Sequence, residues 1–142
     1  MRLSTKVRYA VRAMLDLTLH AGGSAVSSRD VAERQAVSEK YMGQLLAQLR
    51  TTGLVRSVRG QGGGYRLART PEDIRLLDIV LAFEGSMAPV ECVDDPKTCE
   101  RASSCAARQF WCELKDAVEK PLRKTTLSAL AGRQRKLTGG ES

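Results

Sequence analysis

The sequence predicts a mainly α-helical protein with one small β-hairpin, arranged as a winged helix-turn-helix domain followed by a long dimerisation helix. Apolar residues recur at helical spacing through most of the 142 residues. Strand-like character is confined to two short segments on either side of the glycine-rich stretch 60–64. A single helix with an apolar stripe, placed after a small domain, needs a second surface to cover it. A second copy of the chain is the simplest such surface.

Three amphipathic helices are predicted within residues 5–51. The first, over residues 5–20, has an apolar face of Val7, Ala10, Val11, Met14 and Leu15, and leaves Lys6, Arg8, Arg12 and Asp16 for its other faces. Ser27, followed three residues later by Asp30, resembles a capping box and predicts a second helix to about residue 35. Ser38 predicts the start of a third helix, which Gly53 ends. The short turn between the second and third helices indicates a helix-turn-helix motif.

A β-hairpin is predicted directly after these helices. Leu54–Arg59 and Tyr65–Arg69 have strand character and are joined by Gly60-Gln61-Gly62-Gly63-Gly64, so together they indicate a wing. This glycine-rich loop lacks the Gly-Lys-Ser/Thr ending of a nucleotide-binding P-loop, and it leads into a strand rather than a helix. Arginines at positions 56, 59, 66 and 69 give the hairpin a cationic border. We therefore expect the wing to lie against DNA, with glycines that let its backbone approach closely.

Two longer helices are predicted in the rest of the chain. Thr70 as cap and Pro71 at the first helical position predict a buried helix to about Glu84. A second helix is expected from Ser104 to Lys124, followed by a short turn through Leu130. Its apolar stripe comprises Phe110, Leu114, Val118 and Leu122. The predicted division is a DNA-binding domain over residues 1–84, a cysteine-bearing loop over 85–105, a dimerisation helix and terminal turn over 104–131, and a flexible tail over 132–142.

The net positive charge is confined to the front of the chain. Residues 1–75 hold 13 Lys and Arg against 6 Asp and Glu, whereas residues 76–142 hold 10 of each, so the first part carries the whole net charge of +7. A basic front domain predicts a polyanion partner, either nucleic acid or an anionic membrane surface, with a merely solvated basic surface as the alternative. The chain has no apolar run of about 18 residues and no signal-peptide pattern, so we expect a cytoplasmic protein without membrane association.

Three cysteines fall within fourteen residues, with six residues between Cys92 and Cys99 and five between Cys99 and Cys105. In a reducing compartment such cysteines favour metal binding or redox sensing over structural disulfides. Soft thiolates suit zinc or an iron–sulfur cluster, but structural zinc usually takes ligands in pairs two to four residues apart. The spacing therefore favours a cluster. A zinc site and a metal-free thiol–disulfide switch stay open as alternatives.

The fourth ligand of such a cluster is unassigned. The candidates are Cys112, Glu91, Asp94, Asp95, His20, a group of a partner chain, or water. Cys112 lies two helical turns beyond Cys105, so we interpret it as a buried thiol instead. No convincing Cys–His or carboxylate pair is present, and we therefore expect neither an enzyme nor a small-molecule substrate.

The predicted DNA contacts lie on the third helix and the wing. On the helix they are Ser38, Lys40, Tyr41 and Gln44, and on the wing they are Arg59, Gln61, Gly62 and Gly63. Gln44 can make a bidentate contact with adenine, and Lys40 can reach guanine or phosphate. Arg59 suits a minor groove, where it would read groove width. A dimer would hold two such helices about 34–36 Å apart on double-stranded DNA.

Several motifs together resemble a known family. They are Arg8-Tyr9-Ala10-Val11, Ser38-Glu39-Lys40-Tyr41, Gly62-Gly63-Gly64-Tyr65, and the three cysteines followed by Phe110-Trp111. They are similar to the iron–sulfur cluster regulator (IscR) branch of the Rrf2-type bacterial transcription factors. The resemblance implies a homodimer on a partly palindromic operator, with affinity tuned by a cluster that senses iron–sulfur, redox or nitric oxide status. It also favours a 2Fe-2S cluster, with a 4Fe-4S cluster as the alternative.

The sequence departs from this family at the fourth cluster ligand. Arg108 stands three residues after the third cysteine, where the namesake regulator has histidine, and arginine stays protonated and cannot ligate. Close relatives use an acidic residue of the first helix, whose counterpart here is Arg8.

Overall fold

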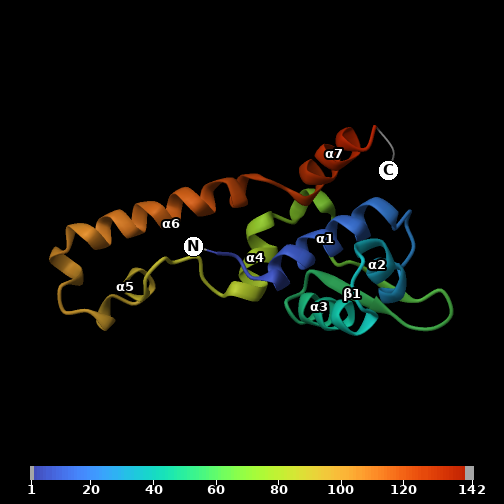
Figure 1. The fold of residues 1–142 in the computed structure, drawn as a ribbon, viewed down its shortest axis with the longest axis horizontal. Helices are drawn as coiled ribbons and strands as arrows, with labels where there is room; N and C mark the ends of the chain where they lie inside the picture. Colours follow the sequence, from blue (N-terminus) through green and yellow to red (C-terminus); the bar gives the residue numbers. More distant parts are fainter. Residues whose placement is uncertain (1, 140–142) are drawn as a thin grey trace.

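The structure is a computed structural model that describes residues 2–139. Its α-helices are α1 (Thr5–His20), α2 (Ser28–Gln35), α3 (Glu39–Thr51), α4 (Leu76–Glu84), α5 (Glu91–Asp94), α6 (Ala106–Lys124) and α7 (Leu127–Leu137). Its strands are β1 (Val55–Val58) and β2 (Gly64–Leu67), and short 3-10 turns cover Pro71–Asp73, Pro96–Thr98 and Ala102–Ser104. Figure 1 shows α1 to α4 and the hairpin gathered at one end, with α6 extending away from them.

Serine hydroxyls set the starts of the first three helices. The hydroxyls of Ser4, Ser27 and Ser38 each accept a hydrogen bond from the backbone N–H three residues later, at 3.3, 3.1 and 3.0 Å. Each cap satisfies one of the backbone donors that a helix leaves unpaired at its N-terminus. Between α2 and α3, Ala36 takes a left-handed conformation with φ of 57° and reverses the chain. The predicted helix-turn-helix is confirmed.

The wing is a two-stranded antiparallel hairpin, shorter than the sequence predicts. Val55 pairs with Leu67 and Val58 pairs with Gly64 at its two ends. Strand β2 is held to the α1–α2 connection near its loop end, because the backbones of Val26 and Tyr65 exchange hydrogen bonds of 2.8 and 2.7 Å. The winged helix-turn-helix fold is therefore built around one core in which Met14, Leu46, Leu49 and Ile79 are completely buried.

The prediction of one continuous helix from Thr70 to Glu84 is wrong. Pro71–Asp73 forms only a 3-10 turn, Ile74 is extended and buried, and α4 begins at Leu76. The cause is a distant segment: the Leu127 N–H donates to the Ile74 carbonyl at 2.8 Å, and the Leu76 N–H donates to the Thr125 carbonyl at 3.0 Å. These pairings use backbone groups that a continuous helix would need for itself.

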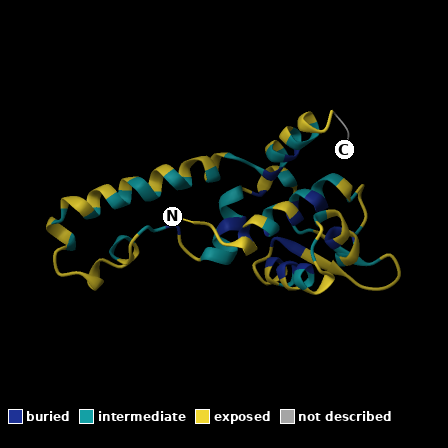
Figure 2. Cartoon of the chain, in the orientation of Figure 1, coloured by how far each residue is buried: buried dark blue, intermediate teal, exposed yellow. Residues whose placement is uncertain are grey.

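Helix α6 extends away from the core and packs on it through its C-terminal half, whereas α7 folds back onto α1. Figure 2 shows α6 in the colours of intermediate and exposed residues, and none of its residues is buried. Helix α7 begins with the buried Leu127 and also buries Ala131. It continues to Leu137, so the prediction of only a short turn to Leu130 is wrong, whereas the flexibility predicted from residue 132 stays a prediction. Residues 140–142 of that predicted tail lie outside the described residues. None of the described helices is long and apolar enough to span a membrane.

Candidate DNA-binding face and cysteine loop

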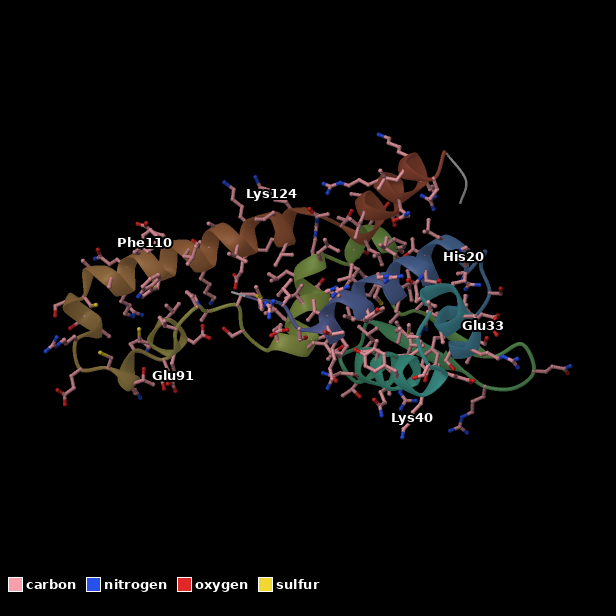
Figure 3. The ribbon with its side chains drawn as sticks, viewed as in Figure 1. His20, Glu33, Lys40, Glu91, Phe110 and Lys124 are labelled. Atoms are coloured by element: carbon pink, nitrogen blue, oxygen red, sulfur yellow. The ribbon has the colours of Figure 1, made fainter. Side chains whose placement is uncertain are left out.

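The exposed side of α3 carries the residues predicted to contact DNA. Met42, Leu45, Leu46 and Leu49 are buried on the opposite side of the helix, which holds it against the core. Ser38, Lys40 and Gln44 are exposed, and Figure 3 shows the Lys40 side chain on the outer side of α3. An α-helix with one free face at this position is the element that enters the major groove in helix-turn-helix proteins.

Tyr41 differs from these exposed neighbours because its ring is anchored. It is half-buried and meets the ring of Tyr9 edge to face, with centroids 5.9 Å apart and an interplanar angle of 86°. The guanidinium groups of Arg8 and Arg12 lie 5.8 and 5.1 Å from the Tyr9 ring centroid. Helix α1 therefore positions Tyr41 at the start of α3. Helical spacing alone did not predict this pairing of rings.

The wing exposes Arg59, Gln61 and Gly62, but Gly63 is half-buried and has a structural reason to be glycine. A Cβ atom at Gly63 would lie 2.3 Å from the Val58 carbonyl oxygen. Arg66 also has an internal partner, since its terminal nitrogen donates to the Gly23 carbonyl at 3.1 Å. Part of the pattern interpreted as DNA-contacting therefore holds the hairpin itself together.

A buried ion pair joins α1 to α2, although the sequence analysis placed Asp16 on a polar face. Asp16 is 2% exposed. Its carboxylate accepts hydrogen bonds from Arg34 at 2.7 and 2.9 Å and from the Gln35 amide at 3.0 Å. The hydrogen bond to Asp16 raises the pKa of Arg34. A weak signal was available: Asp16 lies between Leu15 and Leu17 on a helix whose other charged side chains before it are basic.

The three loop cysteines lie at separate points of the segment that runs beside the N-terminal part of α6 (Figure 1). Cys92 is in α5, Cys99 follows the turn Pro96–Thr98, and Cys105 caps α6 by accepting a hydrogen bond from the Arg108 N–H at 3.4 Å. The Arg108 side chain donates to the Cys92 carbonyl at 2.9 Å. Arg108, which cannot be a ligand, therefore ties the two ends of the cysteine segment together.

The loop is not gathered into a finished metal site in this conformation. Within residues 2–139, no three Cys, His, Asp or Glu side chains come close enough to hold one ion. His20 lines a cleft with α2 and α7, and Figure 3 shows it at the opposite end of the molecule from Glu91. Asp94 accepts hydrogen bonds from Ser86 and Lys115, which lower its pKa, so its carboxylate already has partners. Cys112 is half-buried on α6.

Comparison with known proteins places this arrangement in a family. The Rrf2 family, described as an iron-dependent transcriptional regulator, matches residues 3–133. The chain belongs to the Rrf2 family. It is 40% identical over 130 residues to the protein rrf2 of Nitratidesulfovibrio vulgaris, which covers 92% of this chain and 87% of that relative. The solved structure of CymR, described as the global cysteine regulator of B. subtilis, has a TM-score of 0.77 at 38% identity, over 94% of this chain and 98% of that one. The solved structure of T. potens IscR has a TM-score of 0.77 at 36% identity, over 96% of this chain and 90% of that one.

Membership of the Rrf2 family confirms the resemblance, the winged helix-turn-helix fold and the prediction of a DNA-binding transcriptional regulator rather than an enzyme. Relatives named IscR and relatives named CymR are similar to this Rrf2 protein to nearly the same degree. The choice between a cluster and a thiol switch therefore rests on the cysteines of this chain.

Proposed function

We propose that this Rrf2 protein is a dimeric regulator whose operator affinity is tuned by an iron–sulfur cluster held by Cys92, Cys99 and Cys105. The observation that carries the proposal is their placement on one exposed segment, with Cys92 and Cys105 held near each other by Arg108. This segment joins α4 of the DNA-binding domain to α6. A change in its conformation can therefore act on both.

The donor set fits a cluster by its chemistry. Thiolates are the usual protein ligands of iron–sulfur clusters, and all four cysteines of the chain are free thiols. No residue between 88 and 105 is buried, so the loop can draw its three sulfur atoms together without opening the core. When bound, a 2Fe-2S cluster would supply an iron centre that reacts with oxidants or nitric oxide. The three thiolates would hold it, and Arg108 would keep the ends of the loop in place.

The dimer is proposed to form through the free half of α6. Val118 and Leu122, which the sequence analysis assigned to a partner-facing stripe, pack in this chain against Val80 and Met87. Phe110 remains 54% exposed, and its ring contacts Trp111 edge to face at 5.4 Å. The surface proposed for a second copy is therefore the N-terminal half of the stripe, Phe110 and Leu114, together with the neighbouring Trp111.

The cluster is tested by purifying the protein without oxygen and measuring iron, acid-labile sulfide and the visible spectrum. Single Cys→Ser substitutions at 92, 99 and 105 should each reduce the iron and sulfide content and bleach the spectrum. Cys112→Ser is the matched control and should keep both, because we assign Cys112 to packing. A colourless, iron-free wild-type protein would contradict the cluster.

A thiol–disulfide switch is the second candidate, favoured by the exposed thiol of Cys99. It is distinguished by the same preparation. An iron-free protein whose operator binding still changes with oxidant, and no longer does so in Cys99→Ser, would support the switch in place of the cluster.

The DNA contacts are proposed to divide into two groups. Gln44 and Lys40 read bases, with Ser38 and Tyr41 at the start of the same helix. The wing residues position the protein on the DNA, and they are Arg59, Gln61, Gly62 and Gly63.

Gln44→Ala should weaken binding to a specific, partly palindromic operator by about 1–3 kcal/mol and leave binding to random DNA unaffected. Arg56→Ala is the control, because Arg56 is exposed on the wing and is not among the residues proposed to read bases. It should weaken both DNAs alike and reduce the salt slope by roughly one. Equal loss on both DNAs for Gln44→Ala would contradict the assignment.

A further inference from the structure

A cleft of about 540 Å³ lies between α1, α2 and α7, on the side of the α1 helix that carries His20. Its volume is in the range of small-molecule sites. Helix α1 contributes Leu15 and Leu19 as an apolar wall, α2 contributes Arg34 and Gln35, and α7 contributes Gln134. Three elements therefore meet at one concave surface that neither the DNA contacts nor the cysteines use.

The polar groups of the cleft are arranged around the buried carboxylate of Asp16. Two nitrogens of Arg34 donate hydrogen bonds to the Asp16 carboxylate, and the Gln35 amide donates to the same carboxylate. The Gln35 side-chain oxygen in turn accepts from the Nε of Arg12 at 2.7 Å. This network neutralises Arg34 and fixes the direction of the Arg12 side chain.

Arg12 is left with an uncompensated positive charge at the cleft. Its Nε is used by Gln35, and among the described residues no carboxylate lies within ion-pair distance of its guanidinium. That guanidinium group also lies 5.1 Å from the Tyr9 ring centroid. A held guanidinium with free terminal N–H groups is suited to a carboxylate, which it can bind with two parallel hydrogen bonds.

We propose that this cleft binds a small organic carboxylic acid, whose carboxylate pairs with Arg12 and whose apolar body lies against Leu15 and Leu19. The ligand is an effector and is not consumed. It would contact α2, the first helix of the helix-turn-helix motif, and α7, which follows the helix proposed for dimerisation. A ligand that touches both elements changes operator affinity to the extent that it binds the DNA-bound and free conformations differently.

Benzoate is a suitable probe because it joins a carboxylate to a flat apolar ring. Titration of the full-length protein, followed by amide chemical shifts, should show saturable changes confined to α1, α2 and α7. Benzamide, which has the same shape without the charge, should bind at least about tenfold more weakly, since a hydrogen bond to a charged group is worth about 1.5–3 kcal/mol.

Two substitutions assign the site. Arg12→Gln should weaken benzoate at least about tenfold. Arg8→Gln should leave benzoate affinity unchanged, because Arg8 flanks the same tyrosine ring but does not line the cleft. Gln134→Glu places a negative charge on the α7 wall of the cleft and should also weaken benzoate. Absence of saturable binding, equal affinity for benzamide, or unchanged binding in Arg12→Gln with the native amide spectrum would overturn the proposal.

Discussion

At Gly64 the second wing strand runs against the backbone of the α1–α2 connection. A Cβ atom there would lie 2.2 Å from the Val26 carbonyl oxygen, and the residue has a φ of 149°. Because the obstacle is backbone, Gly64→Ala should lower the free energy of unfolding by more than about 2 kcal/mol. Gly43→Ala is the matched control: a Cβ there meets nothing within 4 Å inside α3, and alanine should stabilise the helix by about 0.5–1 kcal/mol. Urea unfolding measures both, and equal effects would contradict the argument.

At Asp16, burial should increase the contribution of an ion pair to the free energy of unfolding. Asp16→Ala should lower the free energy of unfolding by roughly 2–3 kcal/mol, below the value for a fully enclosed pair, because the Arg34 side chain is 34% exposed. Arg29→Ala, which removes an ion pair to Glu33 on the same helix at 73% and 66% exposure, should change it by less than about 0.5 kcal/mol. Denaturant titrations of the two variants side by side make the comparison. A loss at Asp16 no larger than that at Arg29 would mean that the buried pair is not a stabilising contact.

At the scale of elements, α6 divides into a C-terminal half that packs against α4 and an N-terminal half that keeps Phe110 exposed. Phe110→Glu should leave the winged domain folded and weaken dimerisation at least about tenfold, since it charges the centre of an apolar contact. Asp116→Asn is the control, because its side chain is 80% exposed and points away from the apolar stripe. Sedimentation velocity across a concentration series measures the change. A protein that stays monomeric without any substitution would remove the basis for the proposal.

Elements that are set by local contacts can be predicted from the sequence, and elements that are set by distant contacts cannot. Helices α2 and α3 were predictable because Ser27 and Ser38 cap them through contacts three residues away. The break at Ile74 was not, because its cause is a hydrogen bond from Leu127, far along the chain. The candidate sites follow the same rule. Local sequence is enough to predict the exposure of Lys40 and Gln44 and the spacing of the cysteines. The burial of Asp16 could not be predicted in this way, because it depends on where α2 packs.

For the whole molecule, the proposed sensing requires that a change at the cysteine loop reach α3. Val118 and Leu122 of α6 pack on Val80 of α4 and on Met87, which lies just beyond it. Helix α4 is joined to α3 by the Gln48 side-chain amide, which donates to the Ala82 carbonyl at 2.9 Å. A continuous series of contacts therefore runs from Met87, near the start of the cysteine-bearing loop, to the helix that carries Gln44.

Gln48→Leu should separate cluster loading from DNA affinity. The variant removes the hydrogen bond to α4 without touching a cysteine or the dimer surface, so iron content and sedimentation should match the wild type. The ratio of operator affinities between the cluster-loaded and cluster-free protein should fall by about two- to tenfold, because substitutions along a coupled path change coupling by about 0.5–2 kcal/mol. Thr51→Ala is the control, since its hydroxyl bonds only within α3. If Gln48→Leu keeps the full ratio, the signal does not pass through the contact between α3 and α4.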